Sequence, residues 1–401
     1  MDRDAVVVGG GILGLMVAVL LAEEGRQVDV FVSPQPEPRS DSQRNHSWLQ
    51  SGLLYPGNII SRRMYYDGLG LLDHFVVPHP TKQGIFRFSS SKEVEVFLAH
   101  AKEVQLLGKV EEVSDAEARR ELGAFYQPGC FHFRVPDAPF PEAEVMERAR
   151  SRARVLGVRF WESRVDIEPD PASETGYVLV TENQRIIPRL TVVCAGAGTP
   201  RLLSGLNIQH PLVVNQSVLL VIKEVGAMRV PLLADRTTGL TVVAWDTREI
   251  PPRGRLVVGA GDRRELGLKE QDLVRKVRPS EQDSLIRLLP SDLPLTRGNH
   301  RFTAGQKTDV VMNGKSQVAP WVHACEDFPG LIFAIPGKAT LAFAVAQRIL
   351  DLVSEDLRQK HGPAGDPSPG FEPPPDSTFE ATIHSHHHPE FDNLDDREEE
   401  D

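Results

Sequence analysis

The feature that most constrains the fold is a glycine-rich turn in "DAVVVGGGILGLMVAVLLAEEGRQVDVFVS", which covers residues 4–33. The apolar run before the turn is typical of a parallel strand that is buried on both faces. Gly9, Gly11 and Gly14 form the pattern GxGxxG. In this pattern the first glycine permits a tight turn, the second lets the backbone approach a pyrophosphate, and the third lets a helix pack closely on the strand. The turn therefore predicts a dinucleotide-binding unit.

The segment after the turn fits such a unit except at one position. Residues 12 to about 24 are predicted to form a helix that ends at Gly25, and residues 27–32 a second strand. A dinucleotide-binding unit usually carries an acid at the end of this strand to hold the ribose hydroxyls, but Val32 stands there. Ser33 supplies only a neutral hydrogen bond, which contributes less than one to a charged group. We therefore expect a dinucleotide with a larger contact surface than NAD.

The charge of the chain is concentrated at its C-terminal end. Residues 366–401 carry twelve acidic residues and one arginine, which accounts for the formal net charge of −11 and leaves residues 1–365 neutral. A neutral body gives no electrostatic reason to expect nucleic acid or an anionic membrane surface as a partner. Residues 362–401 are rich in proline and acid, so we predict a disordered tail, with a protein partner as one possible role. No metal site is expected.

The N-terminus carries no sign of a secretory signal. Asp2, Arg3 and Asp4 lead directly into the first predicted strand, and the longest apolar stretch is far shorter than the roughly 20 residues that a membrane span needs. We therefore expect a cytoplasmic protein without a membrane span.

Several later segments carry a resemblance to a known family. They are "SQRNHSWLQSGLLYPGN" (residues 42–58), "VRFWESRVDIEP" (158–169), "TVVCAGAGTPRLL" (191–203), "RFTAGQKTDVV" (301–311) and "PGLIFAIPGKATLAFAVAQRIL" (329–350). With the glycine turn, their order and spacing resemble the D-amino-acid oxidase superfamily of FAD-dependent oxidoreductases, which includes glycine and sarcosine oxidases and L-2-hydroxyglutarate dehydrogenases. The resemblance covers residues 4 to about 353.

The resemblance implies an α/β fold in which a Rossmann-like FAD-binding domain contains an inserted antiparallel β-sheet substrate domain. We expect the FAD-binding domain to be discontinuous, over residues 1–76, 142–207 and 301–356. The substrate domain is expected over 77–141 and 208–300, where short β-like runs such as "GIFRFS" and "SVLLVIKEV" alternate with helical stretches. The substrate, a small molecule, is expected to bind where the antiparallel sheet meets the flavin.

The resemblance also implies how FAD is held. The expected cofactor-binding residues are Gly9, Gly11, Ile12, Gly14, Ser33, Arg44, Asn45, Val165, Ala195, Gly196, Gly337, Lys338, Ala339 and Thr340. The helix after Gly337 presents its N-terminal end, and Lys338 would add to its positive field beside the reduced flavin. The histidine and cysteine that bind FAD covalently in some relatives would fall on Leu49 and near residues 303–304, where neither is present. FAD is therefore expected to be noncovalent.

The expected reaction is dehydrogenation of a small amine, amino acid or 2-hydroxy acid by hydride transfer to flavin N5. The candidate catalytic residues are His46, Gln50 and Tyr55, although the 2-hydroxyglutarate branch usually has a histidine where Gln50 stands. Carboxylate recognition requires arginine or lysine, and Arg255, Arg301 and Lys307 are the candidates. Val32, Gln50 and the acidic tail favour an alternative, a noncatalytic or accessory flavoprotein subunit of a larger assembly.

Overall fold

The computed structural model describes residues 3–34, 47–58, 60–223, 231–246, 254–267, 277–291, 293, 295–296, 298–312 and 314–361. The chain divides into two units, Met1–Asp356 and Leu357–Asp401. All the strands that the structure describes belong to the first unit. The predicted tail, residues 362–401, lies outside the described residues, as do the predicted site residues Arg44, Asn45 and His46.

The first unit contains a mostly parallel sheet. Its strands are β1 (Arg3–Val8), β2 (Val28–Val32), β8 (Arg159–Glu162), β12 (Pro188–Val193), β19 (Trp321–Ala324) and β20 (Leu331–Ile335). They lie in the order β19-β20-β12-β1-β2-β8. Five strands are parallel, and β19 pairs with β20 in the antiparallel direction at one edge. Both faces of its inner strands are covered, which explains apolar runs such as Val6–Val8 in β1 and Leu331–Ile335 in β20.

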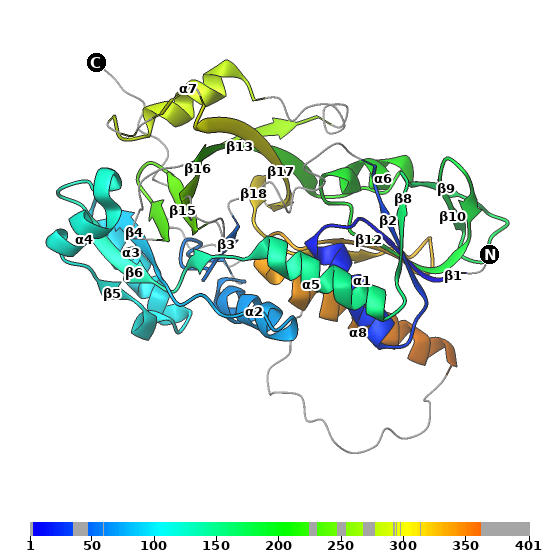
Figure 1. Cartoon of the computed structure of the whole chain (residues 1–401). Coiled ribbons are helices and arrows are strands. Elements are labelled where there is room, and N and C mark those ends of the chain that lie inside the picture. The colour runs from blue at the N-terminus through cyan, green and yellow to red at the C-terminus, as the bar shows by residue number, and fades with distance from the viewer. Residues whose placement is uncertain are drawn as a thin grey trace. The chain divides into compact units, whose positions relative to one another are not determined.

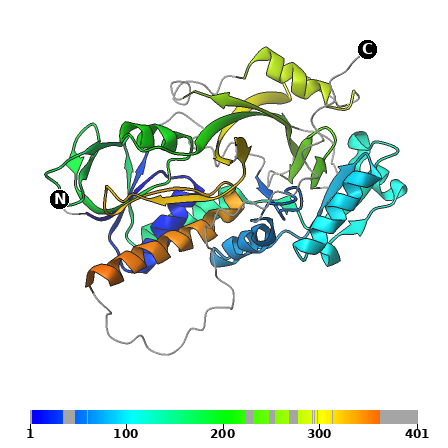
Figure 2. The same ribbon diagram turned by 180° about the vertical axis from the view of Figure 1, so that it is seen from behind.

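Two different layers cover the parallel sheet. Helices α1 (Ile12–Glu23), α5 (Glu142–Val155) and α8 (Ala342–His361) pack on one face, as Figures 1 and 2 show. The opposite face packs on a three-stranded sheet and on helix α6 (Thr199–Gly205); the strands of that sheet are β9 (Asp166–Pro169), β10 (Tyr177–Val180) and β11 (Arg185–Ile186). Alternate residues along a strand pack into the cores on the two faces of the sheet. Val7 packs on the face that the helices cover, and Val6 and Val8 pack on the opposite face.

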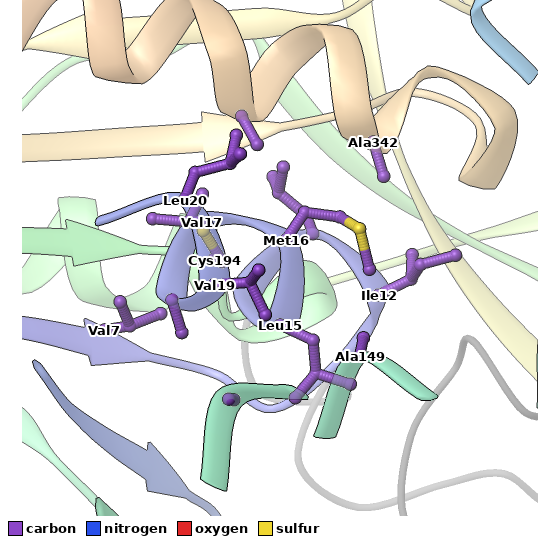
Figure 3. Packing of buried hydrophobic residues seen from close by; sticks show 14 of the residues in the cluster. Val7, Ile12, Leu15, Met16, Val17, Val19, Leu20, Ala149, Cys194 and Ala342 are labelled. Carbon is purple, nitrogen blue, oxygen red and sulfur yellow. The ribbon is translucent and has the colours of Figure 1, made fainter. Parts of the chain in front are cut away.

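Helix α1 is buried on every side. All residues from Ile12 to Ala22 are buried. Figure 3 shows Leu15 beside Ala149 of α5, and the side chain of Met16 extending between Ala342 of α8 and Ile12. A helix without a polar face is stable only inside a core, and here the sheet, α5 and α8 supply that core.

The largest sheet has nine strands and is almost entirely antiparallel. They are β4 (Gly84–Phe88), β5 (Glu111–Glu112), β6 (Phe131–Val135), β13 (Leu212–Lys223), β14 (Leu232–Asp235), β15 (Thr241–Asp246), β16 (Gly254–Leu266), β17 (His300–Met312) and β18 (Lys315–Gln317). Their order is β18-β17-β13-β16-β15-β14-β4-β6-β5, and only β14 and β4 pair in parallel. Strands β17 and β18 belong to this sheet. Residues 301–356, which contain both strands apart from His300, are predicted above to belong to the FAD-binding domain. The domain boundaries themselves stay a prediction.

The remaining elements connect these sheets. They are helices α2 (Ser61–His74), α3 (Ser91–Glu103), α4 (Asp115–Leu122) and α7 (Pro279–Arg287), the 3₁₀ turns η2 (Leu107–Lys109), η3 (Gly123–Phe125), η4 (Gly196–Gly198) and η5 (Ala339–Leu341), and the two-stranded sheet of β3 (Trp48–Leu49) and β7 (Ala138–Pro139). The protein thus has a mixed α/β fold. Among the helices that the structure describes, none combines the length and the apolar character needed to cross a membrane.

Candidate cofactor and substrate site

The predicted cofactor-binding residues that the structure describes gather at one edge of the parallel sheet. Strands β1, β2, β8, β12 and β20 are parallel, so their carboxyl ends share that edge. The chain leaves β1 towards β2 on one side and later returns on the other side as β12, which makes the gap between β1 and β12 a topological switch point. Ligands of open α/β sheets bind outside such a point. The residues that follow these strand ends are Gly9, Gly11, Ile12 and Gly14, then Ser33, Val165, Ala195, Gly196 and Gly337–Thr340.

The glycine turn after β1 has no room for side chains. Gly9 has φ +118°, and a Cβ there would lie 2.3 Å from the carbonyl oxygen of Cys194. A Cβ on Gly14 would lie 1.9 Å from the carbonyl oxygen of Gly9. Helix α1 begins directly after Gly11, so its positive N-terminal end lies at the carboxyl edge of the sheet. The turn therefore forms a backbone cradle suited to an anionic group.

Val32, the residue at the position of the missing acid, packs against this turn. A Cβ on Gly10 would lie 2.6 Å from Cγ2 of Val32. Ser33 is exposed, and Glu162 is the register partner of Val32 on the neighbouring strand β8. An apolar contact thus occupies the end of β2, and none of the described residues of β2 places a carboxylate there.

The loop after β20 also requires a glycine. Gly337 has φ +69°, and a Cβ there would lie 2.6 Å from the carbonyl oxygen of Ala319. Lys338 follows, and its Nζ lies 5.2 Å from the centre of the Tyr55 ring. Thr340 is buried at 1% exposure, and its hydroxyl has no hydrogen-bond partner among the described residues. A buried hydroxyl without a partner and the side-chain-free glycine turns fit a polar cofactor that passes along this edge.

A buried carboxyl group holds the loop that carries Gln50 and Tyr55. Asp137 accepts hydrogen bonds from Trp48 Nε1 at 3.0 Å, from the Ser51 backbone N–H at 3.1 Å and from the Ser51 hydroxyl. Burial raises the pKa of Asp137 to about 7, although the hydrogen bonds from Ser51 and Trp48 act in the opposite direction. The three donors fix the start of the loop against the strand pair β3 and β7.

A second polar cluster stands on the nine-stranded sheet. Lys307 and Asp309 are two residues apart on β17, on the same face, and form an ion pair. Oδ2 of Asp309 accepts hydrogen bonds from Asn215 Nδ2 at 3.0 Å, from Arg263 at 3.1 Å and from the Ser316 hydroxyl at 3.2 Å. Asp309 is fully buried, so these contacts replace the water that a carboxylate requires.

The charged groups of the two polar regions influence one another's pKa values. Burial lowers the pKa of Lys338 to about 7, and Arg263 lowers it further while Asp309 opposes the shift. Burial and the neighbouring Lys338 lower the pKa of Lys307 to about 8. Burial raises the pKa of Tyr55, whose hydroxyl lies beside the Gln50 amide. Three cationic groups therefore act on one acid, Asp309, and burial favours the neutral form of both lysines.

Four of the predicted site residues therefore lie together: Gln50, Tyr55, Lys307 and Lys338. Arg301 is exposed and lies six residues before Lys307 on β17. That separation is about 20 Å along a strand, so Arg301 and Lys307 do not share a pocket. The backbone of Arg255 belongs to β16, but its side chain lies outside the described residues.

Sequence reasoning missed Asp137, Arg263 and Asp309. The alternation of Lys307 and Asp309 on a predicted strand was a usable signal, because residues two apart share a face. Asp137 and Arg263 gave no comparable signal, since their partners are 86 and 46 residues away in the chain.

A comparison with family models assigns the chain to a family. Residues 4–350 match the family model described as FAD dependent oxidoreductase (DAO), and the chain belongs to this family. The predicted resemblance and the predicted cofactor, FAD, are thus confirmed. No curated protein matches the chain.

Solved structures agree on the fold. Glycine oxidase from Geobacillus kaustophilus superposes with a TM-score of 0.70 and 17% identity, over 88% of this chain and 95% of that one. Iminodiacetate oxidase from Chelativorans sp. BNC1 gives 0.70 and 15%, over 90% and 97%. L-alpha-glycerophosphate oxidase from Mycoplasma pneumoniae, solved with FAD bound, gives 0.70 and 14%, over 88% and 95%. At these identities the likeness shows the fold alone.

Proposed function

We propose that this protein dehydrogenates a small amine, amino acid or 2-hydroxy acid that carries a carboxylate, with noncovalent FAD as the hydride acceptor. The observation that carries the proposal is the meeting of Lys307, from the nine-stranded sheet, with Tyr55 and with Lys338, from the loop after β20. This meeting connects two regions. One is the edge of the parallel sheet where the predicted cofactor residues gather, and the other is a cluster of residues that can bind an anion. The amino-acid and iminodiacetate oxidases among the similar folds are consistent with such substrates.

The proposal interprets the parallel sheet as a Rossmann-like FAD-binding part and the nine-stranded sheet as the substrate side. The glycine turn with the start of α1 would hold the pyrophosphate, and the loops after β12 and β20 would contact the rest of the cofactor. The Thr340 hydroxyl offers a hydrogen bond there. Bound FAD supplies the hydride acceptor at flavin N5. The covalent-attachment residues of some relatives are absent, which supports noncovalent binding.

Lys307 is the proposed carboxylate ligand. Asp309 pairs with its ammonium group and is itself held by a hydrogen bond from Asn215. Arg263 adds positive charge but is itself engaged by Asp309. A substrate carboxylate that reaches Lys307 would restore the charge that burial disfavours, and so raise the pKa of the lysine. This arrangement orients the substrate against the edge that carries Lys338.

Lys338 is the proposed proton acceptor. A substrate hydroxyl group, or an amine that binds in its ammonium form, must give up a proton for its carbon to lose a hydride, and the Gln50 amide cannot take that proton. Lys338, with a pKa of about 7, is partly neutral at neutral pH and can accept it at Nζ. Tyr55, which lies beside Gln50, stands against Lys338 at the same site.

The test replaces Lys307 in the FAD-loaded protein. Reduction of the flavin is followed anaerobically with a panel of small amino, imino and 2-hydroxy acids. For the donor that reduces the flavin, Lys307→Met should weaken binding by about tenfold or more, because a charge-assisted contact is lost. Lys307→Arg should retain most of the affinity. Lys315→Met, an exposed lysine on β18, is the matched control. Unchanged substrate affinity in Lys307→Met would remove this residue from the proposal.

A further inference from the structure

Glu162 ends strand β8, directly beside the strand end where the expected acid is missing. Strands β2 and β8 are parallel neighbours at one side of the sheet (Figure 1). Glu162 is the register partner of Val32, and the pairing continues beyond it, since the Ser163 N–H donates a hydrogen bond to the Val32 carbonyl oxygen at 3.0 Å. Because the carboxyl ends of parallel strands share an edge, Glu162 stands at the edge where the predicted cofactor residues gather.

The side chains of Glu162 and Val32 leave the sheet on the same face. One pair earlier, Phe31 and Trp161 stack on each other with ring centres 6.3 Å apart. Successive residues of a strand alternate between the faces, so the next pair, Val32 and Glu162, lies on the opposite face from these rings. Val32 packs there on the core that the helices cover, and it also contacts Gly10 of the glycine turn. Glu162 therefore projects on the face that carries the turn and α1.

The position of Glu162 suits a ligand that runs along the strand ends. Neighbouring strands lie about 4.8 Å apart, and a glutamate side chain is long enough to carry its carboxylate across that spacing, in front of Val32. Glu162 is exposed, so a ligand can reach it. Two predicted cofactor residues flank this position, because Ser33 follows Val32 on one strand end and Val165 comes three residues after Glu162 on the other. A cofactor that contacts both would pass beside the Glu162 carboxylate.

We propose that Glu162 accepts the hydrogen bonds of the adenosine ribose hydroxyls of FAD and so replaces the acid that β2 lacks. An acid at the end of the second strand has this task in dinucleotide-binding units, and a carboxylate can accept from both hydroxyls because it has two oxygens. Here the carboxylate comes from the neighbouring strand, while Val32 stays packed against the glycine turn. The inference concerns cofactor binding and does not depend on the reaction proposed above.

The test compares FAD with an analogue whose adenosine ribose lacks the 2′ and 3′ hydroxyls. Full-length protein is loaded with either flavin and diluted, and the return of flavin fluorescence gives the Kd. The wild type should bind FAD about tenfold or more tightly than the analogue, because the analogue cannot donate to a charged acceptor. Glu162→Gln should weaken FAD binding by about tenfold and leave binding of the analogue nearly unchanged.

Two further variants complete the design. Glu112→Gln removes an exposed charge on β5, at an edge of the nine-stranded sheet, and should leave both Kd values unchanged. Ser33→Ala should retain the preference for FAD over the analogue. The proposal would be overturned by a wild type that binds both flavins equally, by equal losses for both in Glu162→Gln, or by a preference that disappears in Ser33→Ala and persists in Glu162→Gln. Far-ultraviolet circular dichroism and melting temperatures establish that each variant is folded.

Discussion

Asp137 determines where two of the candidate site residues stand. Its carboxyl group receives three hydrogen bonds from the loop that leads to Gln50 and Tyr55. Asp137→Ala would leave these donors buried without an acceptor, at about 1–3 kcal/mol for each group. We expect a loss of about 3 kcal/mol in the free energy of unfolding and weaker FAD binding. Asp137→Asn keeps one acceptor and should cost about 1 kcal/mol. Urea denaturation and FAD titration measure both effects.

The pH dependence of Asp137 has a definite sign. Burial raises the pKa of Asp137 to about 7 in the folded protein, above its ordinary value of 3.8. The stability that this shift contributes is complete below the ordinary pKa and is lost as the pH rises through about 7. The wild type should therefore lose stability relative to Asp137→Asn between those values. A constant difference between the two proteins over that range would contradict the raised pKa.

Lys338 should show the opposite dependence. Burial lowers the pKa of Lys338 to about 7 from 10.5, so the charged form is disfavoured in the folded apoprotein. Lys338→Met removes that penalty and should raise the melting temperature by about a few degrees below pH 7. The gain should shrink as the pH rises from about 7 towards 10.5, because only the unfolded wild type then keeps the proton. Lys315→Met, at an exposed position, should show no such trend.

At the scale of elements, the close contact of α1 with β1 depends on Gly14. A Cβ there would lie 1.9 Å from a backbone oxygen, so Gly14→Ala must displace the helix from the strand. We expect a loss of about 2–3 kcal/mol in stability and weaker FAD binding. Gly70→Ala is the matched control, since nothing lies within 4 Å of a Cβ at that helical position. It should be stabilising by about 0.5–1 kcal/mol. Equal stability of the two variants in urea would show that the close contact is unimportant.

Elements with local signals were predictable. The helix predicted from Ile12 to about Glu24 is α1, Ile12–Glu23, and the strand predicted over residues 27–32 is β2, Val28–Val32. Glycine, proline and apolar periodicity set both, because they act over a few neighbouring residues. Pairing was not predictable in this way. The parallel contact of β14 with β4 joins segments about 150 residues apart, and periodicity indicates which face is buried but not which strand lies beside it.

The residues of the candidate site also fall into two groups, those that a local sequence signal predicted and those that depend on tertiary contacts. Lys338 and Tyr55 were found from motifs that resemble the family, and Lys307 from its strand position. The residues that set their electrostatics, Arg263 and Asp309, come from strands paired through β13. Their contact depends on the tertiary structure and leaves no local trace in the sequence.

In the molecule as a whole, one unit, Met1–Asp356, contains both sheets that the proposed site joins. The parallel sheet supplies Lys338 through the loop after β20, and the nine-stranded sheet supplies Lys307 through β17. All the described strands belong to this unit, so the FAD-binding and substrate-binding residues are expected to form one cooperative structure.

The most direct test is the visible spectrum of the purified protein under anaerobic conditions, before and after addition of small amino, imino and 2-hydroxy acids. We predict that the protein shows a flavin spectrum and that acid releases the flavin into the supernatant. At least one carboxylate-bearing donor should bleach the spectrum, and Lys307→Met should weaken this bleaching. A flavin spectrum that no donor bleaches would instead fit a noncatalytic flavoprotein. A colourless protein that cannot be reconstituted with FAD would contradict the account as a whole.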